Sequence, residues 1–523
     1  MKNSFYPTPI IKGEGTDPKV IKTEDGYYCI VSAIIYFPTV CVYHSKDLIH
    51  WKHVGNVIED EEWCRKMNYD DVDDPFGFWA CGFFQYKGRY YCFVDYAREA
   101  GKYSGDITVD GVSIFISGSD SPCGPYSEPK HLITTANGID PSFFEDDNGD
   151  CYLIIKGNDL KNNSTVAYPI DIENSKITGE GFNIWSGTGG STPEGSFVFK
   201  HNGYYYQSLS EGGCGGPQHR TTMARSLSLK GPWEPSPYNP IIFQDDLTAP
   251  VQRCGGATFT YTPDGRWWAV HIGARPIALE SGYSVTPLGR EVMLSPMKWT
   301  DDGWLVFDDE YNKLPCLEEC LISSEKSDDF SNGRMHSDWY FVRIPNKELF
   351  ECTKNNLRIY SDGIDFNTKE NKSRCFIHLS DFYVNIVSKF QPHFSDKKGS
   401  AGITYFYNYR HYVNISLDGD NTIRIRSCKH GEETILYSIP YERESVILSV
   451  VLDHGMIRFS YKFDEESEEI FCEKSFRATH VSDEGSSADP IGCCGYNFAG
   501  VGIFVTGKGN YCDFSYFKYL NDF

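Results

Sequence analysis

The sequence lacks the features of a membrane protein and of a metal-thiolate protein. No run of about 18 apolar residues could span a bilayer, and the first residues, MKNSFYPTPIIKG, lack the apolar core of a signal peptide. The 18 cysteines are scattered, with no Cys-x-x-Cys pair and no Cys/His cluster at zinc spacing. Cys29, Cys92 and Cys151 lie in strand-like runs and are interpreted as small buried apolar residues. These absences favour a cytoplasmic protein.

Basic residues are scarce relative to acidic ones. Lys and Arg number 49 against 72 Asp and Glu, which gives a formal net charge of −23. Such a charge repels polyphosphate backbones and anionic membranes, so we expect a neutral substrate and neither nucleic acid nor membrane as a partner. The 523 residues exceed one typical domain, and 15% of them are aromatic. Helical periodicity is scarce, so the sequence predicts an all-β chain of two domains.

A strand-turn-strand pattern occurs five times in the first half of the chain. Each copy has a turn glycine followed by aromatic residues, as in HNGYYY at 201–206. Successive turn glycines are separated by 62, 61, 54 and 62 residues; they are Gly26, Gly88, Gly149, Gly203 and Gly265. A near-constant period of this size predicts the blades of a β-propeller over residues 1–315, with its end near Leu314.

Nine residues before each turn glycine lies a shared position. Its occupants are Asp17, Trp79, Asp140, Glu194 and Gly256. The innermost strand of every propeller blade runs along the central channel, so equivalent positions on different blades converge at one end of it. We therefore expect a ring that holds two Asp, one Glu and one Trp.

This ring suits the hydrolysis of a glycosidic bond. The reaction needs one acid to protonate the leaving oxygen and one carboxylate to activate water or attack carbon. A third carboxylate can keep the acid protonated near neutrality, and an aromatic ring can pack on a sugar. Taken singly, these Asp and Glu residues are ordinary turn residues, and the Trp is an ordinary core residue. The shared position of three acids in five repeats is what favours catalysis.

From about Ser327 the period ends, and short strands with period-two alternation follow. Examples are YVNIVSKF at 383–390 and GVGIFVTG at 500–507. Eight or more antiparallel strands of this kind predict a second domain over residues 326–523, a sandwich of two packed sheets. Asp329 and Asp513 near its two ends could ligate a structural calcium ion, although a turn or capping position explains them equally well.

Several long segments resemble family 43 glycoside hydrolases, in the β-xylosidase/α-L-arabinofuranosidase branch. They occur in the family's order and include PTPIIKGEGTDP, GIDPSFFEDDNGDCYLI, WSGTGGSTPEGSFVFKHNGYYYQSLSEGG and TPLGREVMLSPMKWTDDGW. The resemblance covers essentially the whole chain. It implies a five-bladed β-propeller followed by a concanavalin-like (jelly-roll) β-sandwich, and an inverting, exo-acting hydrolase that requires no cofactor.

The resemblance also implies roles for single residues. Asp17 would be the general base that activates water, and Glu194 the general acid. Asp140 would be the orienting acid and pKa modulator. The residues expected to pack on the terminal sugar and to bind its hydroxyls are Phe37, Trp79 and Arg290.

One departure from the family concerns the centre of the channel. Where the family reads Gly-His-Gly, with a His that helps to hold a hydrated cation, this chain has Gly255-Gly256-Ala257. We therefore predict no metal ligand, and either water or a side chain from another blade would fill the space. His219, in GGPQHRTTMARS, could reach the pocket rim and bind substrate, although a structural histidine is the simpler interpretation.

The leading hypothesis is release of terminal β-D-xylose, α-L-arabinofuranose or both from oligosaccharides, with inversion. A fructan- or sucrose-type retaining glycosidase is an alternative, but its Asn-Asp-Pro-Asn, Arg-Asp-Pro and Glu-Cys motifs are absent. A catalytically impaired carbohydrate-binding propeller is a second alternative, which Gly256 allows and the three acids oppose. The sequence does not rank xylose against arabinose. It also leaves open the linkage and whether the chain forms a homo-oligomer.

Overall fold

The computed structural model describes residues 8–13, 15–74, 76–98, 111–136, 138–157, 164–282, 284–311, 326–472, 475–486 and 497–521. Strands dominate these residues. The helices among them are short: α1 (Glu61–Lys66), α2 (Asp483–Ser486) and the 3-10 turns Tyr69–Asp71 and Lys347–Leu349. None of the described helices has the length and apolar character needed to cross a membrane. The described cysteines are free, and Cys29, Cys92 and Cys151 are buried in strands as predicted.

The chain divides into two compact units. The first comprises Met1–Arg275 and Arg290–Leu321, and the second comprises Pro276–Gly289 and Ile322–Phe523. The sequence predicted one continuous first domain over residues 1–315. Its expected end near Leu314 lies outside the described residues.

The segment Pro276–Gly289 belongs with the second unit, which differs from the predicted domain organisation. It carries β24 (Ile277–Ala278) and β25 (Ser284–Val285), which pair antiparallel. The Thr286 amide donates to Glu484 Oε2 at 2.7 Å, across 198 positions of sequence. The Pro287 carbonyl accepts from the Ala499 amide at 2.8 Å. Periodicity reports only local patterns, so it could not reveal contacts of this span.

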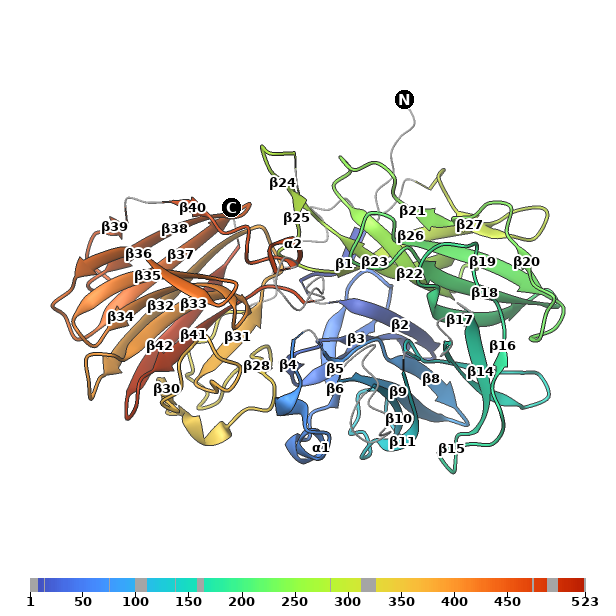
Figure 1. Ribbon diagram of the computed structural model, residues 1–523, viewed down its shortest axis with the longest axis horizontal. Helices are drawn as coiled ribbons and strands as arrows, with labels where there is room; N and C mark the ends of the chain where they lie inside the picture. The colour runs from blue at the N-terminus through green and yellow to red at the C-terminus, as the bar shows by residue number, and fades with distance from the viewer. Residues whose placement is uncertain are drawn as a thin grey trace. The chain divides into compact units, whose positions relative to one another are not determined.

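Five antiparallel sheets make up the first unit (Figure 1). The first contains β2 (Thr16–Thr23), β3 (Gly26–Ser32), β5 (Thr39–Ser45) and β6 (Lys52–Ile58). The second contains β7 (Gly77–Phe78), β8 (Gly82–Tyr86), β9 (Arg89–Ala97), β10 (Val112–Ser119) and β11 (Lys130–Thr135). The third contains β12 (Ser142–Glu145), β13 (Cys151–Lys156), β14 (Thr165–Asp171), β15 (Lys176–Ile177) and β16 (Phe182–Asn183). The fourth contains β17 (Glu194–His201), β18 (Tyr204–Glu211), β19 (Arg220–Ser226), β20 (Glu234–Pro235) and β21 (Ile242–Phe243). The fifth contains β22 (Gln252–Tyr261), β23 (Trp267–Ala274), β26 (Glu291–Trp299), β27 (Leu305–Phe307) and β1 (Thr8–Ile11).

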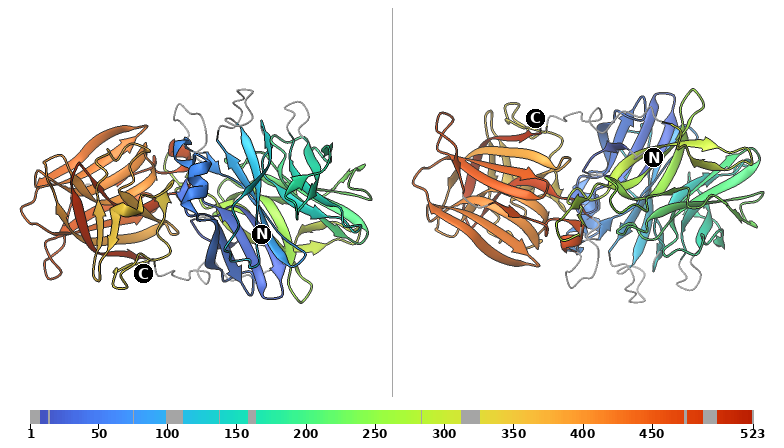
Figure 2. Two further views of the ribbon diagram at one scale, coloured as in Figure 1. Left: turned by 90° about the horizontal axis from the view of Figure 1, so that it is seen from below. Right: turned by 90° about the horizontal axis from the view of Figure 1, so that it is seen from above.

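The five sheets close into a ring (Figure 1), and Figure 2 shows the same sheets from two other sides. Their innermost strands contact one another in the order β2, β8, β12, β17, β22 and back to β2. The first strand of the chain, β1, pairs with β26 of the fifth sheet and so joins the two ends of the ring. The fully buried Glu291 reinforces this closure, because it accepts from Arg275 Nε at 2.6 Å and from the Gly13 amide at 3.1 Å. The predicted five-bladed β-propeller is confirmed.

Turn glycines and aromatic residues account for the blades. Each of the five repeat glycines joins the inner strand of a blade to the second strand, with a left-handed φ between 79° and 126°. Glycine adopts this conformation without steric cost. Aromatic rings fill the space between neighbouring blades: Phe84 stacks on Phe143 with centroids 4.0 Å apart, and Phe199 lies 5.9 Å from Phe259. The high aromatic content is therefore largely a requirement of blade packing.

Two antiparallel sheets make up most of the second unit. One contains β29 (Phe350–Cys352), β30 (Leu357–Tyr360), β42 (Tyr511–Leu520), β32 (Tyr383–His393), β37 (Val446–Asp453), β38 (Met456–Lys462), β39 (Ile470–Phe471) and β40 (Phe476–Arg477). The other contains β31 (Arg374–His378), β41 (Gly500–Thr506), β33 (Ser400–Asn408), β34 (His411–Asp418), β35 (Thr422–Lys429) and β36 (Glu432–Pro440). The short strand β28 (Phe341–Val342) lies outside both. Apolar residues of both sheets, such as Ile386 and Ile403, share one buried core, so the predicted sandwich is confirmed.

The two acids predicted as calcium ligands have other partners. Both oxygens of Asp513 accept hydrogen bonds from Arg358, at 2.7 and 2.9 Å. Asp329 Oδ1 accepts from the Ser331 amide at 3.0 Å. The Asp329 contact agrees with the turn position that was the alternative, the ion pair of Asp513 was not predicted, and calcium binding stays a prediction.

Candidate active site

The three predicted acids lie where the inner strands of three blades begin. Asp17 is the second residue of β2, Asp140 lies just before β12, and Glu194 is the first residue of β17. Strand pairing is irregular beside Asp17 and beside Glu194. Asp17 and Asp140 have left-handed φ values of 56° and 58°, and Gly195 has 61°. Left-handed backbone at a residue other than glycine costs about 1–3 kcal/mol and clusters at active sites. Irregular pairing of this kind, a β-bulge, also changes the direction in which side chains point. A left-handed residue at or next to each acid is the distortion that all three share.

Arg290 pairs with Asp17. Its Nη1 lies 3.2 Å from Asp17 Oδ2 and 3.4 Å from Oδ1. The Arg290 side chain is 5% exposed and that of Asp17 is 22% exposed, so the carboxylate is the more accessible partner. The same Nη1 lies 3.4 Å from Cys214 Sγ, a neighbour that sequence analysis did not include. Burial raises the pKa of the Cys214 thiol to about 12, so this neighbour is uncharged.

Lys156 pairs with Glu194. Its Nζ donates to Glu194 Oε2 at 3.0 Å, and the two side chains are 11% and 14% exposed. Lys156 ends β13 of the third blade, whereas Glu194 begins the inner strand of the fourth. This contact between blades places a cation beside the predicted general acid, and sequence analysis did not foresee it.

Asp140 holds a proton near neutral pH. Its pKa is raised from 3.8 to about 7, first by burial and then by the negative charges of Glu194 and Asp17. Its Oδ2 lies 3.8 Å from the point that a Cβ on Gly195 would occupy. The structure therefore brings the three predicted acids together, with Asp140 next to the start of β17.

Trp79 and Phe37 occupy neighbouring segments. Trp79 is half-buried, and its indole stacks on Phe76 with centroids 5.7 Å apart. A bridge between Ile34 and Phe78 places the loop that leads to β4 (Tyr36–Phe37) beside the residue before Trp79. Phe37 is only 3% exposed. Packing of these two rings on a sugar stays a prediction.

His219 fills the space beside the fifth ring position. A Cβ on Gly255 would lie 2.7 Å from its ring, and a Cβ on Gly256 would lie 3.9 Å from its Cε1. Its Nε2 lies 2.7 Å from Ser210 Oγ, and its Nδ1 lies 2.8 Å from the Arg253 carbonyl oxygen. Burial lowers the pKa of His219 to about 4, so the ring is neutral. A side chain from another blade thus occupies this place. Because both nitrogens are engaged and the ring is buried, the geometry favours the structural interpretation of His219 over substrate binding.

The cation that the family resemblance implies at the channel centre finds no ligand set there. Gly256 has no side chain, and the His219 nitrogens are already engaged. In the part of the chain that the structure describes, no group of three or more His, Cys, Asp and Glu side chains could hold a metal ion. The residues present do not fit such an ion.

A second set of residues surrounds the acids, each seven positions after a turn glycine. Its members are Ala33, Asp95, Lys156, Ser210 and Ile272. Three of them support the ring position of the following blade. Lys156 binds Glu194, Asp95 Oδ2 accepts from the Asp140 amide at 3.0 Å, and Ser210 holds His219 beside Gly256. Counting seven residues forward from each turn glycine, along the second strand of the blade, would have identified these residues in the sequence.

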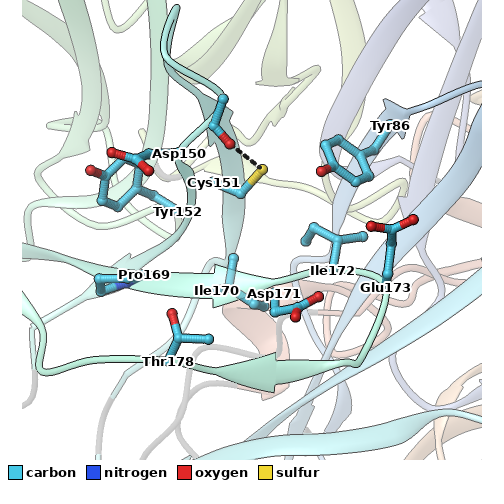
Figure 3. Close-up of a pocket in the computed structure, with 11 residues that line it drawn as sticks. Tyr86, Asp150, Cys151, Tyr152, Pro169, Ile170, Asp171, Ile172, Glu173 and Thr178 are labelled. Carbon is cyan, nitrogen blue, oxygen red and sulfur yellow. Dashed lines mark hydrogen bonds between the residues drawn. The ribbon is translucent and has the colours of Figure 1, made fainter.

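A separate hollow of about 400 Å³ opens on the third blade (Figure 3). Its lining includes Tyr86, Asp150, Cys151, Tyr152, Asp171 and Glu173. The Cys151 thiol donates a hydrogen bond to the Gly149 carbonyl oxygen, with the sulfur and oxygen atoms 3.7 Å apart; it is the dashed line in Figure 3. Gly149 follows β12 whereas Asp140 precedes it, so the hollow lies at the far end of that strand. None of the predicted site residues lines it, and it is not the candidate active site.

A five-bladed propeller that collects three carboxyl groups, one of them protonated near neutrality, has the parts that cleavage of a glycosidic bond requires. The fold and the site thus define a glycoside hydrolase. Comparison with known families makes this specific. The model of glycosyl hydrolases family 43 matches residues 6–305, and that of the beta xylosidase C-terminal concanavalin A-like domain matches residues 327–520. The chain belongs to glycosyl hydrolases family 43.

Individual relatives match over nearly their whole length. The Bacteroides ovatus protein named non-reducing end alpha-L-arabinofuranosidase BoGH43B is 28% identical over 540 residues, covering 98% of this chain and 94% of that protein. A Butyrivibrio fibrisolvens protein named xylosidase/arabinosidase is 26% identical over 541 residues, covering 97% and 98%. The crystal structure of the GH43 protein BlXynB from Bacillus licheniformis superposes with a TM-score of 0.88 at 30% identity, covering 98% and 99%. The family resemblance seen in the sequence is confirmed.

Proposed function

We propose that this chain is an inverting, exo-acting hydrolase that releases terminal β-D-xylose, α-L-arabinofuranose or both from short oligosaccharides. The observation that carries this proposal is the grouping of Asp17, Asp140 and Glu194 at the starts of three inner strands, with Asp140 protonated near neutrality. Relatives named for arabinofuranosidase and for xylosidase/arabinosidase activity support both products.

The proposed reaction uses two of the acids directly. Asp17 takes a proton from water as the water oxygen attacks the anomeric carbon, on the face opposite the leaving group. Glu194 gives its proton to the glycosidic oxygen as the C–O bond breaks. The sugar leaves as a hemiacetal of inverted configuration. Asp17 then releases its proton to solvent and Glu194 regains one, which restores the enzyme.

The neighbouring side chains suit these roles. Arg290 Nη1 lies 3.2 Å from Asp17 Oδ2, and this ion pair orients the proposed general base. Lys156 Nζ donates to Glu194 Oε2 at 3.0 Å and so orients the proposed general acid. Asp140 is the adjacent group that carries a proton near neutrality and can supply the cluster with it.

The stereochemistry of the product tests this mechanism. Proton NMR should show that the first-formed sugar has the inverted anomeric configuration, with nitrophenyl xyloside and arabinofuranoside as substrates. A retained configuration would contradict the mechanism and favour the fructan-type alternative. Binding without cleavage across a panel of nitrophenyl glycosides would favour the carbohydrate-binding alternative. The same panel ranks xylose against arabinose.

A matched pair of variants tests the general acid. Glu194→Gln should lower kcat/KM on xylobiose by about 100-fold or more, because the sugar leaving group needs protonation. The loss on nitrophenyl xyloside should be smaller, since nitrophenolate leaves without a proton. Glu145→Gln, an exposed residue at the far end of β12, is the control and should match the wild type. Wild-type activity of Glu194→Gln on xylobiose would show that the assignment is wrong.

A further inference from the structure

Asp95 connects two ring positions. It lies on β9, the second long strand of the second blade, and is fully buried. Its side-chain Oδ2 accepts a hydrogen bond from the Asp140 amide at 3.0 Å. Its main-chain oxygen accepts from the Trp79 amide at 2.9 Å. One buried residue therefore fixes the backbone of ring residues on two successive blades.

The Asp95 carboxyl is a neutral acid. Its Oδ1 is buried and has no hydrogen-bond partner among the described residues, and no described Lys or Arg forms an ion pair with Asp95. An ionised carboxylate in that setting would cost several kcal/mol. Accordingly, the pKa of Asp95 is raised well above 3.8, first by burial and then by the charge of Asp140. A protonated carboxyl can still accept the Asp140 N–H through its other oxygen.

The Asp140 backbone needs such a support. Its φ of 58° is left-handed, and the proline that follows it packs closely on the neighbouring blade. A Cβ on Gly82 of β8 would lie only 2.7 Å from the Pro141 carbonyl oxygen. The N–H bond to Asp95 ties the strained residue to β9 at the point where its side chain turns toward Glu194. Lys156 holds Glu194 from the equivalent position of the next blade.

We propose that Asp95 is a positioning residue for the hydrolysis, which holds the Asp140 backbone, and through it the Asp140 carboxyl, in place as an uncharged hydrogen-bond acceptor. This inference rests on the proposed function. It also predicts that an amide can replace the Asp95 carboxyl, because an Asn side chain keeps the acceptor oxygen and the shape.

Two substitutions at Asp95 test the proposal. Asp95→Asn should retain kcat and KM within about threefold and keep the pH profile of kcat/KM, whereas Asp95→Ala should lower kcat by about 10- to 100-fold with a smaller change in KM. Asp146→Ala is the control: this carboxylate bonds Tyr205 at 2.9 Å beyond the far end of β12. Its loss should lower Tm without changing kcat. Crystal structures of wild type and Asp95→Ala should show Asp140 leaving the left-handed conformation in the variant.

Each result bears on the proposal. Wild-type kcat in Asp95→Ala, or an unmoved Asp140 backbone, would overturn it. A large loss or a shifted pH profile in Asp95→Asn would show that the carboxyl is charged, which overturns it as well. If Asp95→Ala fails to fold, the kinetics of Asp95→Asn decide. An inactive wild type would contradict the proposed function alone, because the comparison of the two crystal structures still tests the support of Asp140.

Discussion

Replacement of Asp140 by Asn should stabilise the first compact unit near neutral pH while it abolishes activity. The pKa of Asp140 is raised from 3.8 to about 7, chiefly by burial and then by Glu194 and Asp17. The folded chain therefore keeps a proton that the unfolded chain releases above pH 3.8. A group with a raised folded-state pKa stabilises most at low pH, and this contribution is lost as the pH rises toward 7. Asn has nearly the same shape and cannot ionise, so the variant escapes that loss.

The magnitude follows from the interval of pH. Between pH 5 and about 7 the free energy of unfolding of the wild type falls by about 1.4 kcal/mol per pH unit because of Asp140. Over these two pH units the loss is about 3 kcal/mol. For a compact unit as large as the first one, Tm changes by roughly 2 °C for each kcal/mol of unfolding free energy. The Tm advantage of Asp140→Asn over the wild type should therefore grow by about 6 °C from pH 5 to pH 8.

Differential scanning calorimetry at constant ionic strength measures this change. Groups away from the site titrate equally in both proteins, so the difference between variant and wild type reports Asp140 together with the carboxyl groups coupled to it. Asp245→Asn, which removes an exposed carboxylate of the same unit, is the control for the loss of one negative charge. A Tm difference of Asp140→Asn that is equal at pH 5 and pH 8 would refute the reasoning, because Asp140 would then be ionised throughout.

Three further substitutions test other contacts of the first unit. Lys156→Met removes the partner that holds Glu194 Oε2 at 3.0 Å, so the proposed general acid is less well placed and kcat/KM should fall by about 10-fold; an unchanged kcat/KM would contradict this. Gly255→Ala places a methyl group 2.7 Å from the His219 ring, and the overpacking should cost about 1–3 kcal/mol of unfolding free energy, seen as a lower Tm. Glu291→Ala leaves Arg275 without its buried partner and should cost about 3–5 kcal/mol in urea unfolding. A midpoint equal to that of the wild type would show that this pair does not hold the ring closed.

The propeller and its acids could be predicted because the turn glycines and the ring positions recur at fixed places in a sequence repeat. Each blade needs a left-handed turn after its inner strand, and glycine meets that need at little cost, so Gly26 and its four equivalents mark the period. Counting back from them reaches the start of each inner strand, where the ring lies. One local pattern thus identified Asp17, Asp140 and Glu194 without knowledge of any contact between blades.

Contacts between distant parts of the chain could not be predicted in this way. Lys156 ends an apolar strand, CYLIIK, and reads as an ordinary surface lysine until the fourth blade brings Glu194 to it. Asp95 reads as a polar interruption in FVDYA, and only the third blade gives its side chain a partner. The Pro276–Gly289 segment fits the first domain by sequence, yet its hydrogen bonds lie nearly 200 residues away. In each case a contact between residues far apart in the sequence determines the partner or the unit of the residue, and no local pattern reveals such a contact.

The neighbouring side chains also distinguish the three acids of the ring from one another. Asp17 is paired with Arg290 and Glu194 with Lys156, whereas no Lys or Arg among the described residues forms an ion pair with Asp140. Burial and the charges of Glu194 and Asp17 raise the pKa of Asp140 to about 7, and the charges of Lys19 and Lys156 oppose this shift without forming an ion pair with it. The ring alone therefore does not distinguish Asp140 from Glu194. The distinction comes from the position seven residues after the turn glycine, which places a lysine behind Glu194 and an uncharged Asp95 behind Asp140.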